Sequence, residues 1–411
     1  MAESANGGAP APDLDAEREH VEQLARAHAA LAAAQDRSYW LDRWGVDLNE
    51  LMRSPAGDRM RVALRVARRG KRVAIEVKRR LAQEAREAGE ELAGAGDVPV
   101  DDPLARTARP SPVASGPVTD LLYARLGDDG VAAVEAAVDD GERTQLRDAP
   151  ELDRRRLLLG YGVHRKVPAV MERTGLSAAT PPSDVHSMAR GPMAAGGSTY
   201  YADLVAEALA AGGLEIAAGM TALDFGCSSG RVVRTFAAAH RDVTWHACDP
   251  NAEAIEWAAA NLAGVEFAVS GLRPPLPLAD GALDFAYAIS IWSHFAAGAA
   301  ADWLADMRRL VRPGGLLVLT THGFQTIAHD HAHGIRSAEQ LTEIRDALYA
   351  AGFWFKDEFA HGGDHGVVEA GWGTAFMTAE WLLTHAPGWK VAGFWPGRAE
   401  GNQDVYLLER R

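Results

Sequence analysis

An apolar run that passes directly into a glycine-rich turn is the feature that most constrains how this chain folds. ALDF at 222–225 has the composition of a buried strand, and GCSSGR at 226–231 leads from it into a stretch with helical spacing. Gly226 lets the chain turn tightly after the strand, and Gly230 lets a ligand or a neighbouring segment approach the start of the helix. This strand, turn and helix predict a ligand site at the edge of an open α/β sheet.

Strand-like and helix-like segments continue to alternate after this turn. Helices are expected to start near Arg231, Asn251 and Ala299. The last two strand-like runs are joined only by PGRAEGNQ, which is shorter than the roughly dozen residues of a parallel crossover, so they should form an antiparallel hairpin. The sequence therefore predicts an α/β fold with a mostly parallel sheet and a terminal antiparallel hairpin. The strands are expected at 221–225, 243–249, 265–270, 283–291, 315–322, 389–395 and 404–410.

Changes in composition along the chain predict its domain organisation. The first residues are rich in Ala, Gly, Pro and acids, a later stretch is rich in proline, and the region before the first strand has helical patterning. The predicted segments are a mobile tail at 1–18, a helical arm at 19–91, a linker at 92–117, a helical subdomain or lid at 118–213 and the sheet domain at 214–411.

Within the helical arm, residues 53–86 form a basic segment in an otherwise acidic protein. This segment contains twelve Lys and Arg residues and only three acidic ones, and its apolar residues recur at helical steps. An amphipathic helix of this kind suits weak contact with an anionic membrane surface or binding of an anionic substrate. A solvated face of a helical arm is the alternative, and it is the interpretation that we favour.

The overall composition excludes several classes of protein. The chain has 42 Lys and Arg residues against 56 Asp and Glu residues, and its net charge of -14 disfavours nucleic acid as a partner. No apolar stretch reaches the roughly 18 residues of a membrane span, and the first residues lack the pattern of a signal peptide, so a cytoplasmic location is expected. Two cysteines, Cys227 and Cys248, are too few for a disulfide framework or a four-thiolate zinc site.

Two acidic residues at strand ends suggest what the glycine turn binds. Asp224 offers a hydrogen-bond acceptor just before the turn, and Asp249 ends the next strand, where a carboxylate can accept hydrogen bonds from ribose hydroxyls. A dinucleotide-binding motif would have glycine at the positions of Ser228 and Arg231. An NAD-dependent oxidoreductase is therefore the less favoured interpretation of this site.

Four ordered motifs resemble the class I S-adenosylmethionine-dependent methyltransferases. They are ALDFGCSSGR, ACDPN, LRPPLPLADGALDFAYAISIWSHF and LADMRRLVRPGGLLVLTTHG, and the resemblance covers about residues 200–411, including the final hairpin. It implies a Rossmann-like fold and S-adenosylmethionine as the cofactor. Within this family, the LPL, SxxxH, TTHG and QDVYLL elements look most like methyltransferase domains found beside glycosyltransferases in bacterial glycan and natural-product clusters.

The resemblance also implies which residues contact the cofactor. Asp224 and Gly226 would face its methionine part, Asp249 its ribose, and the residues after the third strand its adenine. The usual central glycine is Ser228 here, and a positive φ at this serine would cost of the order of 1 kcal/mol. The implied cofactor-binding residues are Asp224, Gly226, Cys227, Ser228, Gly230, Asp249, Pro250, Ser270, Gly271, Leu272, Ile289 and Ser290.

The methyl acceptor needs a base, and two histidines follow strands of the predicted sheet. His294 is favoured and His322 is the second candidate, while a structural histidine that binds a loop is the alternative for both. The His-rich stretch 322–365, together with Trp354, Trp372, Trp381 and Trp395, suggests an acceptor loop, and we expect no metal in that stretch because no H-E-x-x-H pair occurs. The expected acceptor is a hydroxyl, or less readily an amine, of a sugar, glycan or small metabolite. A non-catalytic or regulatory domain that binds the cofactor is the other alternative.

Overall fold

The computed structural model describes residues 115–182, 196–357 and 371–411. These residues belong to one compact unit, Ala108–Arg411. The tail at 1–18, the helical arm with the basic segment 53–86, and all but the end of the linker lie outside the described residues. None of the described helices is long and apolar enough to cross a membrane.

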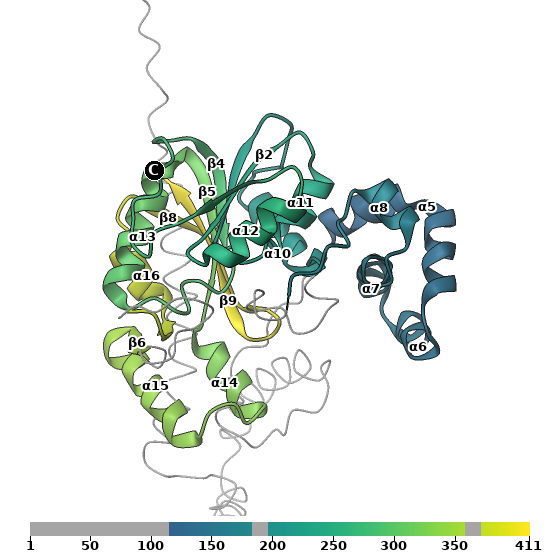
Figure 1. Ribbon diagram of the computed structural model, residues 1–411. Coiled ribbons are helices and arrows are strands. Elements are labelled where there is room, and N and C mark those ends of the chain that lie inside the picture. Colours follow the sequence, from purple (N-terminus) through teal and green to yellow (C-terminus); the bar gives the residue numbers. More distant parts are fainter. Residues whose placement is uncertain (1–114, 183–195, 358–370) are drawn as a thin grey trace, which may run out of the picture. The chain divides into compact units, whose positions relative to one another are not determined.

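A central sheet of seven strands, in the order β3-β2-β1-β4-β5-β9-β8, organises this unit (Figure 1). Strands β1 to β5 of this sheet pair in parallel, and β9 runs antiparallel between β5 and β8. The α/β fold with a mostly parallel sheet and a terminal antiparallel hairpin is therefore confirmed. The strands are β1 (Thr221–Phe225), β2 (Thr244–Asp249), β3 (Glu266–Val269), β4 (Leu283–Ala288), β5 (Val311–Thr321), β8 (Trp389–Ala399) and β9 (Gln403–Arg410).

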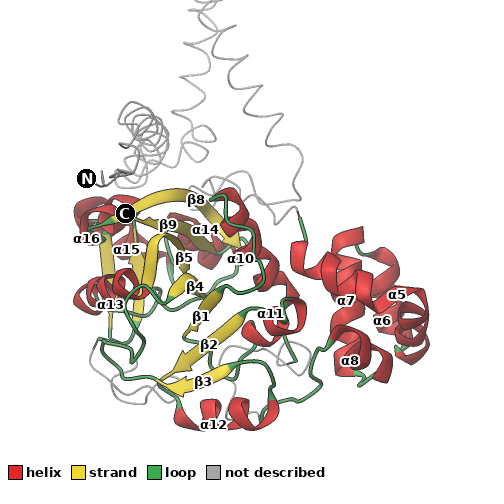
Figure 2. Ribbon diagram, turned by 90° about the horizontal axis from the view of Figure 1, so that it is seen from above, coloured by secondary structure: helices red, strands yellow, loops and turns green. Residues whose placement is uncertain are grey.

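Helices cover both faces of the sheet, as the view from above shows (Figure 2). Alternate residues of a strand point to opposite faces, so Leu316 and Val318 of β5 join one hydrophobic cluster and Leu317 and Leu319 join the other. Helices α10, α11 and α12 pack in the first cluster, and α13 and α16 pack in the second. These helices are α10 (Thr199–Ala211), α11 (Val233–Ala239), α12 (Ala252–Asn261), α13 (Ala297–Leu310) and α16 (Ala379–His385).

A second, two-stranded sheet was not predicted from the sequence. Strands β6 (Phe353–Lys356) and β7 (Thr374–Met377) pair antiparallel, after helices α14 (Phe324–Ala332) and α15 (Ala338–Ala351). His322, directly after β5, forms a β-bridge with Phe376 of β7, so β7 lies beside the end of β5. This small sheet brings the chain around residue 373 to the carboxyl ends of the parallel strands.

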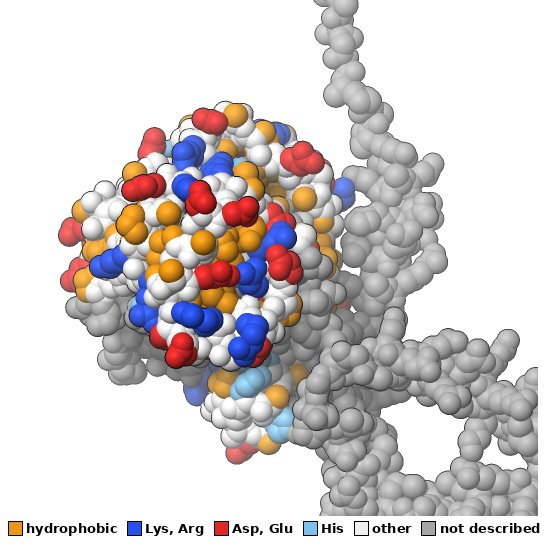
Figure 3. All heavy atoms as spheres, turned by 90° about the vertical axis from the view of Figure 1, so that its right-hand side faces the viewer, with side chains coloured by type: hydrophobic (Ala, Val, Ile, Leu, Met, Phe, Trp, Pro, Cys, Tyr) orange, Lys and Arg blue, Asp and Glu red, His pale blue; other side chains and the backbone are white. Residues whose placement is uncertain are grey.

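Four described helices precede α10 in the sequence: α5 (Pro117–Ala137), α6 (Asp140–Asp148), α7 (Glu151–His164) and α8 (Pro168–Thr174). Their outer face carries basic and acidic side chains next to one another (Figure 3). One of its ion pairs joins Arg155 to Glu151, one helical turn apart. The described residues before β1 contain helices and no strand.

The carboxylate of Asp203 attaches these helices to α10. The side chain of Asp203 is fully buried and accepts hydrogen bonds from the backbone N–H groups of Val118 and Thr119, both at 2.9 Å, and from Thr119 Oγ1 at 2.6 Å. Arg156 Nη2 of α7 also donates to it, at 2.9 Å. Burial raises the pKa of Asp203, and the bonds from Thr119 and Arg156 oppose that rise. One side chain of α10 thus caps the start of α5 and pairs with α7.

We predict that Asp203→Ala lowers the free energy of unfolding by about 3 kcal/mol, because it leaves the buried N–H groups of Val118 and Thr119 without their acceptor and removes the buried carboxylate that pairs with Arg156. Urea unfolding of the full chain, followed by circular dichroism, measures the change. Asp148→Ala is the control, because the pair of Asp148 with Arg147 is largely exposed and should contribute little. Equal unfolding midpoints for the two variants would contradict the prediction.

Candidate active site

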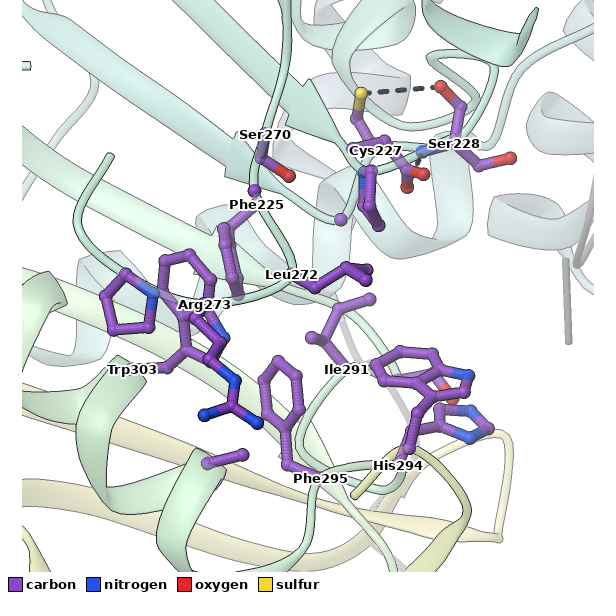
Figure 4. A pocket seen from close by; sticks show the side chains of 18 of the residues that line it. Phe225, Cys227, Ser228, Ser270, Leu272, Arg273, Ile291, His294, Phe295 and Trp303 are labelled. Carbon is purple, nitrogen blue, oxygen red and sulfur yellow. Dashed lines mark hydrogen bonds between the residues drawn. The ribbon is translucent and has the colours of Figure 1, made fainter. Parts of the chain in front are cut away.

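A cavity of about 370 Å³ lies at the carboxyl ends of β1, β2 and β4. The carboxyl ends of parallel strands meet at one edge of a sheet, so the loops after these strands come together there. Figure 4 shows Cys227 and Ser228 at one end of the cavity and His294, Phe295 and Trp303 toward the other. Of the predicted cofactor-binding residues, those that line the cavity are Asp224, Gly226, Cys227, Ser228, Asp249, Pro250, Ser270, Gly271, Leu272, Ile289 and Ser290.

Gly230 is the predicted cofactor residue that the structure does not bring to this cavity. Its φ is +75°, and a Cβ atom there would lie 2.8 Å from Leu262 and 3.2 Å from Phe267. Glycine at this position therefore permits close packing of the turn against the end of α12 and β3. At Gly230, the segments that approach closely are Leu262 and Phe267 of the protein itself, and Gly230 does not line the cavity.

The glycine turn is fastened to the neighbouring strand. The backbone N–H groups of Gly226 and Cys227 both donate to the carbonyl oxygen of Cys248, at 2.9 and 3.0 Å. Gly226 has a φ of +80°, and a Cβ atom there would overlap the side chain of Ile291, which also lines the cavity. Only glycine fits this combination of backbone conformation and close contact.

Ser228 adopts the left-handed conformation, with a φ of +48°. This conformation costs about 1 kcal/mol for a residue with a Cβ atom. It places the Ser228 N–H group 2.8 Å from Asp249 Oδ2, while Asn251 N donates to Asp249 Oδ1 at 2.9 Å. Two backbone amides from different loops therefore hold the Asp249 carboxylate in place at the cavity wall.

Asp224 is a buried carboxylic acid beside the turn. Its side chain lines the cavity, and its Oδ2 atom has no hydrogen-bond partner among the described residues. Burial raises the pKa of Asp224 to about 7, against the opposing effects of the Tyr287 hydroxyl and the Val233 amide. The site therefore contains one carboxylate that backbone amides hold in place, Asp249, and one that titrates near neutral pH.

The other end of the cavity is aromatic and contains His294. The ring centroids of Phe225 and Trp303 lie 4.7 Å apart, and the imidazole of His294 stacks on Trp372 at 4.8 Å. His294 Nδ1 lies 2.8 Å from the carbonyl oxygen of Gly373. A carbonyl only accepts hydrogen bonds, so Nδ1 carries the proton and Nε2 carries the lone pair that a base needs.

His322, the second predicted base, does not line this cavity. Its Nδ1 atom lies 3.1 Å from the carbonyl oxygen of Ala375, and its Nε2 atom lies 3.2 Å from Gln403 Nε2. Desolvation lowers the pKa of His322 to about 3, and the nearby His294 adds to this effect. Both ring nitrogens of His322 thus contact protein atoms, which fits the alternative of a structural histidine that binds a loop.

The His-rich stretch is only partly described. His329 pairs with Asp330, which also forms an ion pair with Arg336, and no group of His, Cys, Asp or Glu in the described part of the chain is arranged to hold a metal ion. The stretch that contains His361 and His365 lies outside the described residues.

Of the four tryptophans considered from the sequence, Trp372 lines the cavity and Trp381 is buried in the second hydrophobic cluster. Trp354 donates to Glu343 at 3.0 Å, and Trp395 is packed against the first cluster.

Sequence reasoning missed several residues of the aromatic end. Arg273 follows directly after the predicted Leu272, so its position was available as a signal. Phe225 looked like an ordinary strand residue, and Trp303 looked like a core residue of a helix. They belong to the cavity only because α13 packs beside the end of β1.

One segment of the chain is similar to a known family of protein domains. Residues 222–315 match the family model described as a methyltransferase domain. No curated protein matches the sequence. Structures similar to this chain include an S-adenosylmethionine-dependent methyltransferase from Methanosarcina mazei (17% identity, 47% of this chain and 94% of that chain, TM-score 0.35). Another is that of an S-adenosylmethionine-dependent methyltransferase from Mesorhizobium loti (16% identity, 50% and 96%, TM-score 0.33).

The matched segment contains the glycine turn, Asp249 and His294. The match to a methyltransferase domain and the lining of the cavity thus fall on the same part of the chain.

We predict that Gly226→Ala lowers stability more than Gly219→Ala does. Both glycines have a φ near +80°, but a Cβ atom at 226 would overlap Ile291, whereas a Cβ atom at 219 has no neighbour within 4 Å. The backbone strain of about 1 kcal/mol is common to both variants, so their difference reports the contact with Ile291. Urea unfolding measures stability, and calorimetric titration with S-adenosylhomocysteine should show weaker binding for Gly226→Ala only. Equal effects of the two variants on both measurements would refute the assigned contact.

Proposed function

We propose that this protein transfers a methyl group from S-adenosylmethionine to a hydroxyl of a sugar, glycan or other small metabolite, with an amine as the less favoured acceptor. The observation that supports this most is that one continuous cavity joins the glycine turn and its carboxylates to an aromatic end with a histidine. Its volume of about 370 Å³ lies at the lower end of the range of small-molecule sites.

The polar groups of the first end match those of the cofactor. S-adenosylmethionine presents ribose hydroxyls and an ammonium group as donors, and the Asp249 and Asp224 carboxylates line the cavity as acceptors. Asp224 Oδ2 is buried without a partner among the described residues, as expected of an atom that binds a ligand donor. The apolar side chain of Leu272, which is 40% exposed, offers a surface for the adenine.

The second end suits a small acceptor with a polar ring. Phe295, Trp303 and Trp372 provide apolar surfaces, while Arg273 and Asp302 provide charged groups beside them. The resemblance of this segment to methyltransferase domains found beside glycosyltransferases is the reason for favouring a sugar hydroxyl.

The protein's contribution to the reaction is alignment and removal of a proton. Bound S-adenosylmethionine supplies a methyl group on a positively charged sulfur, and as the new oxygen–carbon bond forms, the carbon–sulfur bond breaks and leaves its electron pair on sulfur. His294 Nε2 accepts the proton of the acceptor hydroxyl. The carbonyl of Gly373 and the ring of Trp372 hold the imidazole in the tautomer and orientation for this role.

Labelled S-adenosylmethionine and fractionated metabolites of a cytoplasmic extract test this function. Mass spectrometry should find the label in a small molecule, and His294→Ala should lower the rate by about 10²- to 10⁴-fold, the usual contribution of a general base. Binding of S-adenosylhomocysteine should stay unchanged in this variant. Label found only in protein or nucleic acid would overturn the proposed acceptor, and an unchanged rate in His294→Ala would favour another base or a non-catalytic domain.

We also predict that cofactor binding strengthens as the pH rises toward 7. The pKa of Asp224 is about 7 in the protein without ligand, so at lower pH its carboxyl group is protonated and must lose the proton before it can pair with an ammonium group. Well below this pKa, the affinity for S-adenosylhomocysteine should change by nearly tenfold per pH unit. Asp224→Asn should bind more weakly at pH 7 and show a flatter pH dependence in calorimetric titration. The same slope in both proteins would show that another group titrates.

A further inference from the structure

A hydrogen-bond network behind the cavity connects His322, Gln403 and Ser290. The chemistry of these groups determines which atom donates and which accepts in each bond. His322 provides the starting point, because its Nδ1 atom faces the carbonyl oxygen of Ala375 and must therefore carry a proton. In a neutral imidazole, Nε2 is then an acceptor. The group 3.2 Å from Nε2 must be a donor, which places the NH₂ group, not the oxygen, of the Gln403 side chain there.

The orientation of Gln403 determines the rest of its contacts. Its oxygen accepts from Thr320 Oγ1 at 2.6 Å, and its second N–H donates to Ser290 Oγ at 2.7 Å. Thr320 Oγ1 in turn accepts from the backbone N–H of Ser290 at 2.7 Å. A reversed amide would face the lone pair of His322 with an oxygen, so only one orientation satisfies all of these groups.

Ser293 supplies a second hydrogen bond to Ser290. Its side chain is fully buried, and its Oγ atom lies 3.1 Å from Ser290 Oγ, its one side-chain hydrogen-bond partner among the described residues. A buried hydroxyl proton needs an acceptor, so Ser293 donates to Ser290. Ser290 Oγ then accepts from both Gln403 and Ser293, and these two bonds occupy both of its lone pairs.

The remaining hydrogen-bonding capacity of Ser290 is its own proton. Ser290 lines the cavity, and within the described structure its hydroxyl has no acceptor once both lone pairs are used. Ser290 follows the end of β4, in the segment that continues to His294, and its φ is +61°. We propose that Ser290 is a hydrogen-bond donor to the methyl acceptor and that it selects a hydroxyl over an amine. This inference rests on the proposed function.

The selection follows from counting lone pairs on the atom that is methylated. A hydroxyl oxygen has one proton and two lone pairs, so it can give its proton to His294, attack the methyl carbon with one lone pair and accept from Ser290 with the other. A neutral amine nitrogen has a single lone pair, which the new carbon–nitrogen bond uses. The donor from Ser290 thus stabilises negative charge that develops on oxygen and offers nothing to nitrogen.

The carboxylates at the other end of the cavity support this division of roles. Asp224 and Asp249 are acceptors and suit the donors of the cofactor, whereas the Ser290 hydroxyl is a donor and needs an acceptor atom. The backbone of Ser290 retains its predicted place beside the cofactor. Gln403 is a positioning residue, because it acts on the acceptor only through Ser290.

The first test is the chemistry of the labelled product and the rate of its formation. With methyl-labelled S-adenosylmethionine and extract metabolites, the wild-type protein should form an O-methyl product, as nuclear magnetic resonance of the isolated product shows. Ser290→Ala should lower the rate by about 10²-fold, as loss of one oxyanion donor does. Its affinity for S-adenosylhomocysteine should stay within twofold of the wild type. Thr342→Ala, on the exposed side of α15, is the control and should leave the rate unchanged.

The second test needs neither acceptor nor turnover. Nitrogen-15 resonances of the ligand-free protein should show that His322 is protonated at Nδ1 and unprotonated at Nε2 between about pH 5 and 8. Gln403→Glu places a carboxylate beside Nε2, so His322 should take up a proton there and the Ser290 hydroxyl should turn to the carboxylate. This variant should lose rate as Ser290→Ala does.

The outcomes separate this inference from the proposed function. An N-methyl product, an unchanged rate in Ser290→Ala, or a proton on Nε2 of His322 in the wild-type protein would overturn the role of Ser290 and leave methyl transfer intact. A large loss of S-adenosylhomocysteine affinity in Ser290→Ala without a loss of turnover would also overturn it, because the donor would then serve the cofactor. If no small molecule takes up label, the proposed function fails and this inference fails with it.

Discussion

The pair of backbone hydrogen bonds from Gly226 and Cys227 to the Cys248 carbonyl holds the ends of β1 and β2 together, and the site depends on it. With these ends fixed, the turn brings Ser228 to Asp249, and the unfavourable backbone conformation of Ser228 is offset by a hydrogen bond to a carboxylate. Local backbone strain therefore occurs at a residue of the cavity wall, as is common in functional sites. A more relaxed turn would leave the Asp249 carboxylate without one of its two amide donors.

The two ends of the cavity are built by different means. The end at the glycine turn consists of strand ends and short turns, whose positions the parallel sheet determines. The aromatic end depends on packing between distant segments: α13 brings Trp303, and β7 with its preceding residues brings Trp372 and the Gly373 carbonyl. The helices before the sheet are attached at another place, through Asp203 of α10.

These differences explain how far sequence reasoning reached. Strand periodicity and the glycine turn placed Asp224 and Asp249 at the carboxyl edge, because the residues that follow a strand and a turn are neighbours in the chain. The short strands β6 and β7 were missed because FWFK and TAFM are stabilised by pairing with each other and by contact with the end of β5. It could not be predicted either that His294 lines the cavity and His322 does not. Both histidines follow strands, and only the contacts of His322 with Ala375 and Gln403 distinguish it from His294.

The position of β9 has a consequence for how the protein is made. β9 follows every other strand of the sheet in the sequence, yet it lies between β5 and β8. During synthesis, the long apolar strand β5 therefore presents an unpaired edge until β9 has left the ribosome, and exposed edges of this kind invite aggregation. β8 pairs with β9 in this sheet, so it can join the sheet only together with β9 or after it. Gln403 begins β9, so the wall behind Ser290 is completed only at that last step.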